Sequence, residues 1–354
     1  MAQQDDELVK LLMRALITSD WHLTDSPRDE YRWGFVEKEL PAILKEEQVA
    51  LLLFLGDATE SKSGHSAELV NRLVAAFKRL AELCPVVGLT GNHDGLSPDA
   101  PFFAFLSEVQ RGAISWVQHP TVLADLKNVP EGFSAAERTI LLPNTRQPEK
   151  DWEDIPFREY DWAFAHQCFA TAKSESGFAL SGTSLSFFPK GMTIIAGDIH
   201  RPQTSGPLTY VGSPYHVDFG DGFEPRVLLW DGKRVESLPV NSPQKALVEA
   251  GSLKELSKQK LPEGDIVKVR YEVESYDKWP EAKKEIERWA EERGLVLQLA
   301  QPVINTTPAK ARKRADGEGA LGAAEELSDE DILTAYGKKR QVSDAYVSAG
   351  LKLL

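Results

Sequence analysis

The sequence predicts an α/β fold in which two β-sheets pack together with helices outside, followed by a small α+β capping domain and a helical tail. Three observations predict this class. Apolar runs alternate with helical patterns over residues 15–110, turn residues become denser from residue 114, and a separate β-α-β pattern follows residue 261. We therefore expect a main domain, a capping domain, a flexible linker and a helical segment at residues 1–240, 241–304, 305–326 and 327–354, respectively.

The first part of the chain has the alternation expected of parallel strands joined by helical crossovers. Strands are predicted at residues 15–18, 49–55 and 85–90, where short runs of apolar residues lead up to Gly, Asn or Asp. Helices are predicted between and after them at residues 33–45, 67–83 and 100–109. This βαβ rhythm implies parallel strands with right-handed crossovers.

The middle of the chain predicts a second sheet of more antiparallel character. Its short strands are expected at residues 139–142, 162–165, 193–196, 208–211 and 226–230, with Gly, Pro and Asn between them. In the capping domain we expect a strand, a charged helix and a second strand at residues 265–273, 279–293 and 295–299. The linker that follows has little apolar content, and Ser328-x-x-Asp331 beyond it has the spacing of a helix start.

Composition and charge exclude several classes of protein. The chain has 354 residues and a formal net charge of -13, which argues against a protein that coats nucleic acid through a basic surface. An enzyme that reaches phosphate through bound cations stays possible, since the cations reverse the local field. The start of the chain is acidic, and no run approaches the ~18 apolar residues of a membrane span, so we expect a cytoplasmic protein.

Five short stretches place metal-binding side chains at the end of an apolar run. They are Asp20-Trp21-His22, Gly56-Asp57, Gly91-Asn92-His93-Asp94, Ala165-His166-Gln167 and Gly197-Asp198-Ile199-His200. Each motif alone is weak, because Asp-x-His and Gly-Asp occur by chance in many proteins. Together they predict one site, since the carboxyl ends of strands in α/β sheets are where sites are built.

The residue types suit a pair of divalent cations. Two cations ~3.5–4 Å apart need a carboxylate that bridges them, and Asp57 is the candidate bridge. We expect Asp20, His22 and His200 on the first metal, and Asn92, His166 and Asp198 on the second. Mixed imidazole and oxygen ligands favour Mn, with Mg, Fe or Zn as alternatives. Such a pair makes bound water acidic and supplies hydroxide at neutral pH.

Other residues are candidates for substrate contact. His93 follows the ligand Asn92, and we expect it to stabilise phosphoryl oxygens or to protonate the leaving oxygen, with Asp94 orienting its ring. The alternative for Asp94 is that it caps a turn. Arg201, Tyr215 and His216 are further candidates for the substrate groove.

The ordered motifs resemble the calcineurin-like metallophosphoesterase superfamily, and within it the SbcD-like DNA exonuclease subunits, including phage-encoded ones. The segments that carry this resemblance are Ser19-Asp20-Trp21-His22-Leu23, Gly56-Asp57, Gly91-Asn92-His93-Asp94, His166-Gln167 and Gly197 to Gln203. Tyr210-Val211-Gly212-Ser213-Pro214, followed by Asp218-Phe219-Gly220, is similar to a segment of the nuclease branch. The resemblance covers residues 15–230 well, and the rest of the chain only in layout.

The resemblance implies a four-layer metallophosphoesterase sandwich, with helices flanking two mixed sheets, and a capping domain after it. It implies Mn-dependent hydrolysis of DNA phosphodiesters in repair, recombination or degradation. It also implies an SbcC-like ATPase partner that grips the C-terminal helical segment, and a possible homodimer. If the gene is phage-encoded, the expected location is the cytoplasm of the host.

Two departures from the family pattern bear on function. The last motif usually reads Gly-His-x-His, and here Asp198 stands in place of the first histidine, which predicts a more anionic or a weakened second metal site. Many nuclease members also carry a histidine shortly after the bridging aspartate. Here that stretch is Ala58-Thr59-Glu60-Ser61-Lys62, and His65 further on is either an exposed bystander or a substitute.

Two other functions stay open at this point. One is a metallophosphatase or small-molecule phosphodiesterase, which would have no need of a tethered helical tail. The other is an architectural subunit whose metal site is impaired by Asp198.

Overall fold

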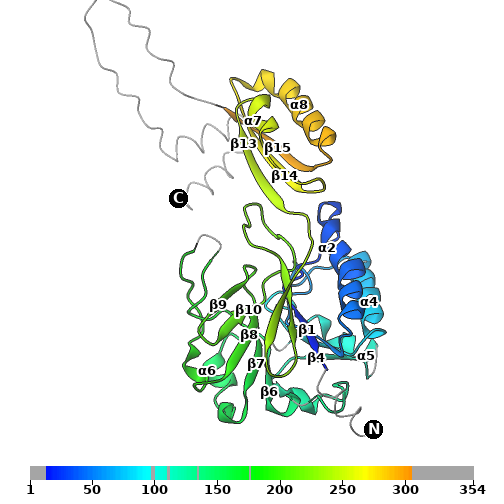
Figure 1. Ribbon diagram of the computed structural model, residues 1–354, viewed down its shortest axis with the longest axis vertical. Helices are drawn as coiled ribbons and strands as arrows, with labels where there is room; N and C mark the ends of the chain where they lie inside the picture. Colours follow the sequence, from blue (N-terminus) through cyan, green and yellow to red (C-terminus); the bar gives the residue numbers. More distant parts are fainter. Residues whose placement is uncertain (1–12, 97–99, 110–111, 134, 175–176, 305–354) are drawn as a thin grey trace, which may run out of the picture. The chain divides into compact units, whose positions relative to one another are not determined.

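A computed structural model describes residues 13–96, 100–109, 112–133, 135–174 and 177–304 (Figure 1). The described residues form two six-stranded sheets and one three-stranded sheet. The first twelve residues, the expected linker and the expected C-terminal helical segment lie outside this description, so the predictions made for them stay predictions.

The first sheet is built mainly from the parallel strands that the βαβ rhythm predicts. In order across the sheet its strands are β12 (Val235–Pro239), β11 (Arg226–Trp230), β1 (Ala15–Thr18), β2 (Leu51–Phe54), β3 (Val86–Leu89) and β4 (Ile114–Val117). Strands β1 to β4 are parallel, whereas β11 is antiparallel to β1 and to β12. The chain therefore returns to the first sheet with β11, which we had expected in the second.

The second sheet has a parallel centre and antiparallel edges. Its strands in order are β5 (Thr121–Val122), β6 (Thr139–Leu142), β7 (Trp162–His166), β8 (Thr193–Gly197), β10 (Leu208–Tyr210) and β9 (Gln203–Ser205). Only the β5–β6 and β9–β10 pairs are antiparallel, so the prediction of a more antiparallel sheet is wrong. The reason lies in the strands themselves: β7 and β8 are apolar and buried on both faces, as is typical of parallel strands.

Helices cover the outer face of the first sheet. Helix α4 (Ala67–Ala81) begins at Ser66, whose Oγ accepts a hydrogen bond from the amide of Leu69 at 3.1 Å, and it buries one apolar side. The single helix expected at 33–45 is instead α2 (Glu30–Gly34), a π-helical stretch (Phe35–Glu39) and α3 (Leu40–Glu46). The helix expected at 100–109 is a 3₁₀ turn (Phe103–Phe105) followed by α5 (Leu106–Val109).

Short helical segments complete the connections. Helix α6 (Pro148–Asp151) follows β6, on the side of the second sheet. The remaining 3₁₀ turns are Pro27–Asp29, Leu123–Asp125, Ala136–Arg138, Phe157–Glu159, Leu185–Phe187 and Tyr276–Lys278.

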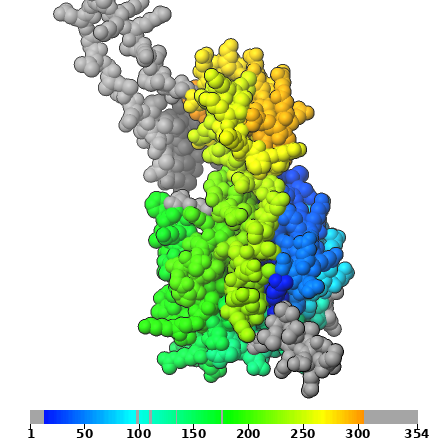
Figure 2. Space-filling model, viewed as in Figure 1, coloured from blue at the N-terminus to red at the C-terminus, as the bar shows by residue number. Residues whose placement is uncertain are grey.

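Side chains that alternate along the strands form three apolar clusters in the main domain. In β2, Leu51 and Leu53 face the second sheet, where they pack with Phe164 and Ile195, while Leu52 and Phe54 face the helices. The outer face of the second sheet has its own apolar cluster. The four expected layers are therefore the outer helices, the first sheet, the second sheet and the segments that cover the second sheet. Helices α2 and α4 and the second sheet lie on opposite flanks (Figure 2).

The C-terminal part of the described chain forms a separate three-stranded sheet. Parallel strands β13 (Lys245–Ala250), β14 (Ile266–Val273) and β15 (Val296–Ile304) pack against α7 (Leu253–Ser257) and α8 (Trp279–Glu292) around their own core. The sequence predicted β14, α8 and β15 but not β13 or α7. None of the helices in the described part of the chain is long and apolar enough to cross a membrane.

Candidate metal centre

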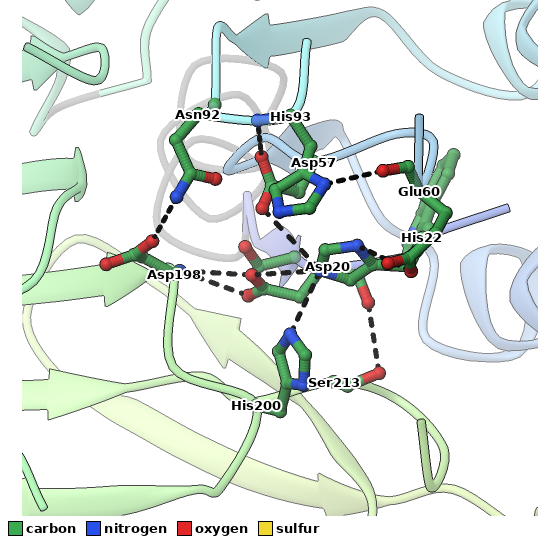
Figure 3. Close-up of polar contacts among 12 residues, drawn as sticks. Asp20, His22, Asp57, Glu60, Asn92, His93, Asp198, His200 and Ser213 are labelled. Atoms are coloured by element: carbon green, nitrogen blue, oxygen red, sulfur yellow. Dashed lines mark hydrogen bonds and ion pairs between the residues drawn. The ribbon is translucent and has the colours of Figure 1, made fainter. Parts of the chain in front are cut away.

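The predicted ligands lie where the carboxyl ends of strands from both sheets meet. Strands β1, β2 and β3 of the first sheet lead to Asp20, His22, Asp57 and Asn92, and strands β7 and β8 of the second lead to His166, Asp198 and His200. Figure 3 shows six of these side chains pointing toward one another from separate loops: Asp20, His22, Asp57, Asn92, Asp198 and His200. The two sheets therefore build one site together.

Asp57 lies between the two halves of the centre. Its Oδ2 is 3.5 Å from Nε2 of His22, and its Oδ1 is 3.4 Å from Nε2 of His166. Two ligand atoms on one cation at metal–ligand distances near 2.1 Å lie roughly 3.0–4.2 Å apart. Each carboxylate oxygen of Asp57 thus faces a different imidazole at a distance that suits a shared cation, which is the arrangement a bridging carboxylate needs.

The first half of the centre brings together Asp20, His22 and His200. One ligand atom from each lies within 4.8 Å of the others. Nε2 of His22 is 3.0 Å from Nε2 of His200 and 4.0 Å from Oδ1 of Asp20. These nitrogens and this oxygen converge on one point, as the prediction for the first metal requires.

The second half contains His166, Asn92 and Asp198. Nε2 of His166 is 3.7 Å from Oδ1 of Asp198, and the same oxygen accepts a hydrogen bond from the side-chain amide of Asn92 at 2.9 Å. The backbone amide of Asp198 donates to the carboxylate of Asp20 at 3.1 and 3.3 Å. Asp198 is therefore within reach of a cation on this side and also ties the two halves together.

Two buried polar atoms in the second half of the centre have no hydrogen-bond partner. They are Oδ1 of Asn92 and Nε2 of His166. A buried polar group without a partner lowers the stability of the folded protein, so such atoms close together indicate a site for a bound ligand. Nδ1 of His166 donates to the carbonyl of Leu55 at 2.5 Å. Nε2, on the side of Asp57, therefore carries the lone pair that a cation would accept. The donor set fits divalent cations.

The loops that carry the ligands have strained backbones. Among non-glycine residues, positive φ angles occur at Asp20 (56°), His22 (44°), Asp57 (61°) and Asp198 (88°), all at the centre, and at Gln48. Such conformations cost free energy and cluster at functional sites. They allow each loop to turn sharply after its strand, so that consecutive side chains reach the same point.

Glycines allow these loops to approach closely. Gly56 has a φ of +99°, and a Cβ there would lie 2.6 Å from Nδ1 of His166 and 2.9 Å from Cα of Gly91. A Cβ on Gly91 would overlap the carboxylate of Asp57. The Gly-Asp and Gly-Asn-His-Asp motifs thus need glycine because the strand ends pack without space for a side chain.

His93 and Asp94 have different environments. The Nδ1 atom of His93 is 2.7 Å from the carbonyl of Glu60, so the ring donates there and Nε2 is the other polar atom of the ring. The carboxylate of Asp94 is fully buried and accepts from the amides of Asp57, Ala58 and Gly91 at 2.7–2.9 Å. Asp94 therefore fixes the loop that carries the bridging aspartate, and the expectation that it orients the His93 ring is corrected.

Glu60 belongs to the centre although the sequence did not identify it. Its Oε2 lies 3.3 Å from Nδ1 of His22 and 3.7 Å from the guanidinium of Arg32, and it groups with His22 and His93. A carboxylate on the second nitrogen of a ligating histidine sets the tautomer and orients the ring. The only signal in the sequence is its position three residues after Asp57.

The buried charges of the centre shift one another's pKa values. Burial opposes charge on Asp57, but the imidazoles of His166 and His22 outweigh it and hold the pKa of this carboxyl below its usual range. Burial also opposes charge on His166, yet the carboxylates of Asp57, Asp20 and Asp198 raise its pKa well above the usual value. Burial raises the pKa of Asp198 to about 6. A cation that binds here therefore displaces protons.

Tyr215 and His216 support the centre from behind and do not line a groove. Tyr215 is fully buried, and its hydroxyl donates to the carbonyl of Trp21. His216 is 2% exposed, its Nε2 donates to the carbonyl of Phe223 at 2.8 Å, and its Nδ1 accepts from the amide of Lys245 at 3.1 Å. The prediction that these two residues contact substrate is therefore wrong, because neither side chain reaches solvent.

The segment around these residues braces the first ligand loop. The hydroxyl of Ser213 donates to the carbonyl of Asp20 at 3.0 Å, and its amide donates to the carbonyl of His200 at 2.8 Å. The Gly-Ser-Pro-Tyr segment thus holds Asp20 and His200 in place. Arg201, the third substrate candidate, is exposed and lines a separate cavity with Phe223 and Arg226.

His65 is held by its surroundings. Its Nε2 is 2.8 Å from the hydroxyl of Thr59, and its ring stacks on Phe102 with centroids 4.2 Å apart. Burial lowers its pKa. His65 is therefore not an exposed bystander, which was one of the two alternatives from the sequence, and its described contacts are with Thr59 and aromatic rings rather than with the predicted ligands.

A sequence profile of the Calcineurin-like phosphoesterase family matches residues 13–202. The chain belongs to this family and is a metal-dependent phosphoester hydrolase. The matched region contains all of the predicted metal ligands, from Asp20 to His200.

The chain is 24% identical over 227 residues to an uncharacterised protein, R555, of Acanthamoeba polyphaga mimivirus, covering 60% of this chain and 17% of that protein. The chain thus spans about a sixth of the length of this curated relative. Among solved structures, the nuclease MPE of Pseudomonas putida is 18% identical, with a TM-score of 0.32 and coverage of 63% of this chain and 87% of that one. The phosphoesterase Yfce of E. coli is 12% identical, with a TM-score of 0.31 and coverage of 65% and 100%.

Binding of Mn²⁺ at pH 7 should release protons, because the carboxylates around His166 and His22 raise the pKa of both imidazoles. Affinity should accordingly fall as the pH is lowered, since acid favours the protonated rings. Calorimetry in buffers of different ionisation enthalpy measures the number of protons released. The release should decrease in His166→Gln and persist in His119→Gln, which changes an exposed histidine elsewhere. Uptake of Mn²⁺ without proton release at pH 7 would contradict this electrostatic picture.

Glu60→Gln should weaken Mn²⁺ binding roughly tenfold, the lower end of the effect of losing a carboxylate partner of a ligating histidine. The amide keeps the shape of the side chain but removes the charge 3.3 Å from Nδ1 of His22. Titration of Mn²⁺ into the variant measures the change. Glu153→Gln, at an exposed position, is the matched control and should bind as the wild type does. Equal affinity in the two variants would mean that Glu60 does not hold His22.

Proposed function

We propose that this protein is a Mn-dependent DNA nuclease, the catalytic subunit of an SbcCD-like nuclease/ATPase complex in DNA repair, recombination or degradation. The observation that carries the hydrolytic part is the position of Asp57, with one carboxylate oxygen 3.5 Å from His22 and the other 3.4 Å from His166. The choice of DNA rests on the similarity of residues 210–220 to the nuclease branch of the family.

The ligands divide into two sets around Asp57. Asp20, His22 and His200 would hold one cation, and Asn92, His166 and Asp198 the other. Bound there, the cations would supply hydroxide at neutral pH and neutralise charge on the phosphoryl group. The three carboxylates among the ligands favour Mn over softer ions.

The chain's own groups position the substrate and handle its proton. His93 keeps Nδ1 on the carbonyl of Glu60, which turns Nε2 toward the space in front of the centre. From there the ring would donate a hydrogen bond to a phosphoryl oxygen, or a proton to the leaving oxygen. The bond to the carbonyl of Glu60 is what restrains the ring, while Asp94 fixes the backbone of the loops that carry Asp57 and Gly91.

The partners proposed for this chain follow from the same resemblance. An SbcC-like ATPase would bind the helical segment at residues 327–354, and two copies of the chain would pair through the main domain. The complex would work in the cytoplasm, or in the host cytoplasm if the gene is phage-encoded. Truncation at residue 326 is expected to abolish ATPase binding but leave hydrolysis of small phosphodiesters.

Purified protein with Mn²⁺ should cleave a labelled DNA duplex, and Asp57→Ala should lose at least about a hundredfold in rate because both halves of the centre share this carboxylate. Product formation on a denaturing gel measures the activity. Asp154→Ala, at an exposed position, is the matched control and should keep wild-type activity. Hydrolysis of bis(p-nitrophenyl) phosphate without DNA cleavage would favour a small-molecule phosphodiesterase. Bound Mn²⁺ without any turnover would favour an architectural subunit.

A further inference from the structure

A cavity of about 300 Å³ opens beside the second half of the centre. Its wall includes Asn92 and Asp198, so it begins at the proposed metal ligands. It also includes Lys62 and Arg146. The volume is at the lower end of the range of small-ligand pockets, about 300–1,000 Å³.

The two sheets contribute to this cavity in the same way. Lys62 lies in the loop after β2 and Asn92 in the loop after β3, both in the first sheet. Arg146 lies after β6 and Asp198 after β8, both in the second sheet. Each sheet therefore supplies one cation and one metal ligand to the wall. Lys62 follows β2, which neighbours β3, and Arg146 follows β6, which neighbours β7, the strand that ends at His166.

Both cations lack a carboxylate partner within the described part of the chain. Arg146 donates to the carbonyl of Leu96 at 3.1 Å, and Lys62 makes no ion pair. Some other arginines do have carboxylate partners, as Arg72 has Glu30 and Glu37. The chain as a whole is acidic, with 54 acidic and 41 basic residues. Two cations without carboxylate partners in one cavity make this part of the surface locally positive. Such a cavity attracts anions.

The loop that carries Arg146 is fixed by hydrogen bonds on both sides. The amide of Thr145 donates to Oε1 of Gln167 at 3.3 Å, and the amide of Gln147 donates to the hydroxyl of Thr145 at 3.0 Å. That hydroxyl in turn contacts the carboxylate of Asp151. Gln167 follows the ligand His166 directly, so the backbone of the loop that carries Arg146 is tied to the metal centre.

We infer that Lys62 and Arg146 form a subsite for a phosphate that flanks the scissile one in a nucleic-acid strand. The inference rests on the proposed nuclease function and adds the reason for substrate choice. The metal ligands take the scissile phosphate, and the two cations in the adjoining cavity take the next. A phosphodiester with a single phosphate has nothing to place there, so the subsite favours oligonucleotides over small esters.

Lys62→Gln and Arg146→Gln test the subsite on a labelled single-stranded oligonucleotide with Mn²⁺. Each should raise KM roughly five- to tenfold and lower the slope of log(kcat/KM) against log salt concentration by about one, as loss of one phosphate contact does. The effect should be much smaller on bis(p-nitrophenyl) phosphate. Lys190→Gln and Arg158→Gln remove the same charges from exposed positions elsewhere and should behave as the wild type.

A chemical substitution identifies the phosphate. Oligonucleotides with a neutral methylphosphonate next to the cleaved linkage should raise KM for the wild type but not for the Lys62→Gln/Arg146→Gln double variant, because the contact is already lost. An equal penalty in both proteins overturns the subsite and leaves the nuclease assignment standing. A wild type that hydrolyses bis(p-nitrophenyl) phosphate but no oligonucleotide overturns the nuclease assignment, and the subsite with it.

Discussion

The structure depends on buried carboxylates and imidazoles that lie close together where the two sheets meet. Asp20, Asp57, His22 and His166 are all almost completely removed from water, and each of the two imidazoles lies within 4.0 Å of a carboxylate. Burying charged groups is costly unless they are paired or bind metal. Here the nitrogens and oxygens converge, but several of their lone pairs have no partner. A cation between them would accept those lone pairs.

The fold meets this requirement through the direction of its strands. Parallel strands in both sheets end at the same edge, so seven ligands from distant parts of the sequence need only short loops to meet. The loops turn sharply, with positive φ angles at four ligands and close contact at Gly56 and Gly91. The Gly-Ser-Pro-Tyr segment then holds the first loop from behind, so a segment that resembles a nuclease motif acts through positioning.

The sequence predicted the parts of the molecule that depend on local pattern. The strands that lead to the ligands follow from apolar runs, and the set of ligands follows from polar residues at their ends. Pairing between distant strands was harder: β11 joins the first sheet, because an apolar run does not specify its neighbour. Strand β13 was missed because charged residues interrupt its apolar pattern. The burial of Tyr215 and the approach of Glu60 to His22 arise from tertiary packing, for which the sequence has no periodic signal.

The proposed hydrolysis depends on two cations that share Asp57. Anomalous scattering from crystals soaked in Mn²⁺ tests this most directly, because it counts the ions and locates each of them. We expect two peaks, one among Asp20, His22 and His200 and one beside His166 and Asn92, with the carboxylate of Asp57 between them. Peaks elsewhere in the protein, or none within coordination distance of Asp57, would contradict the account.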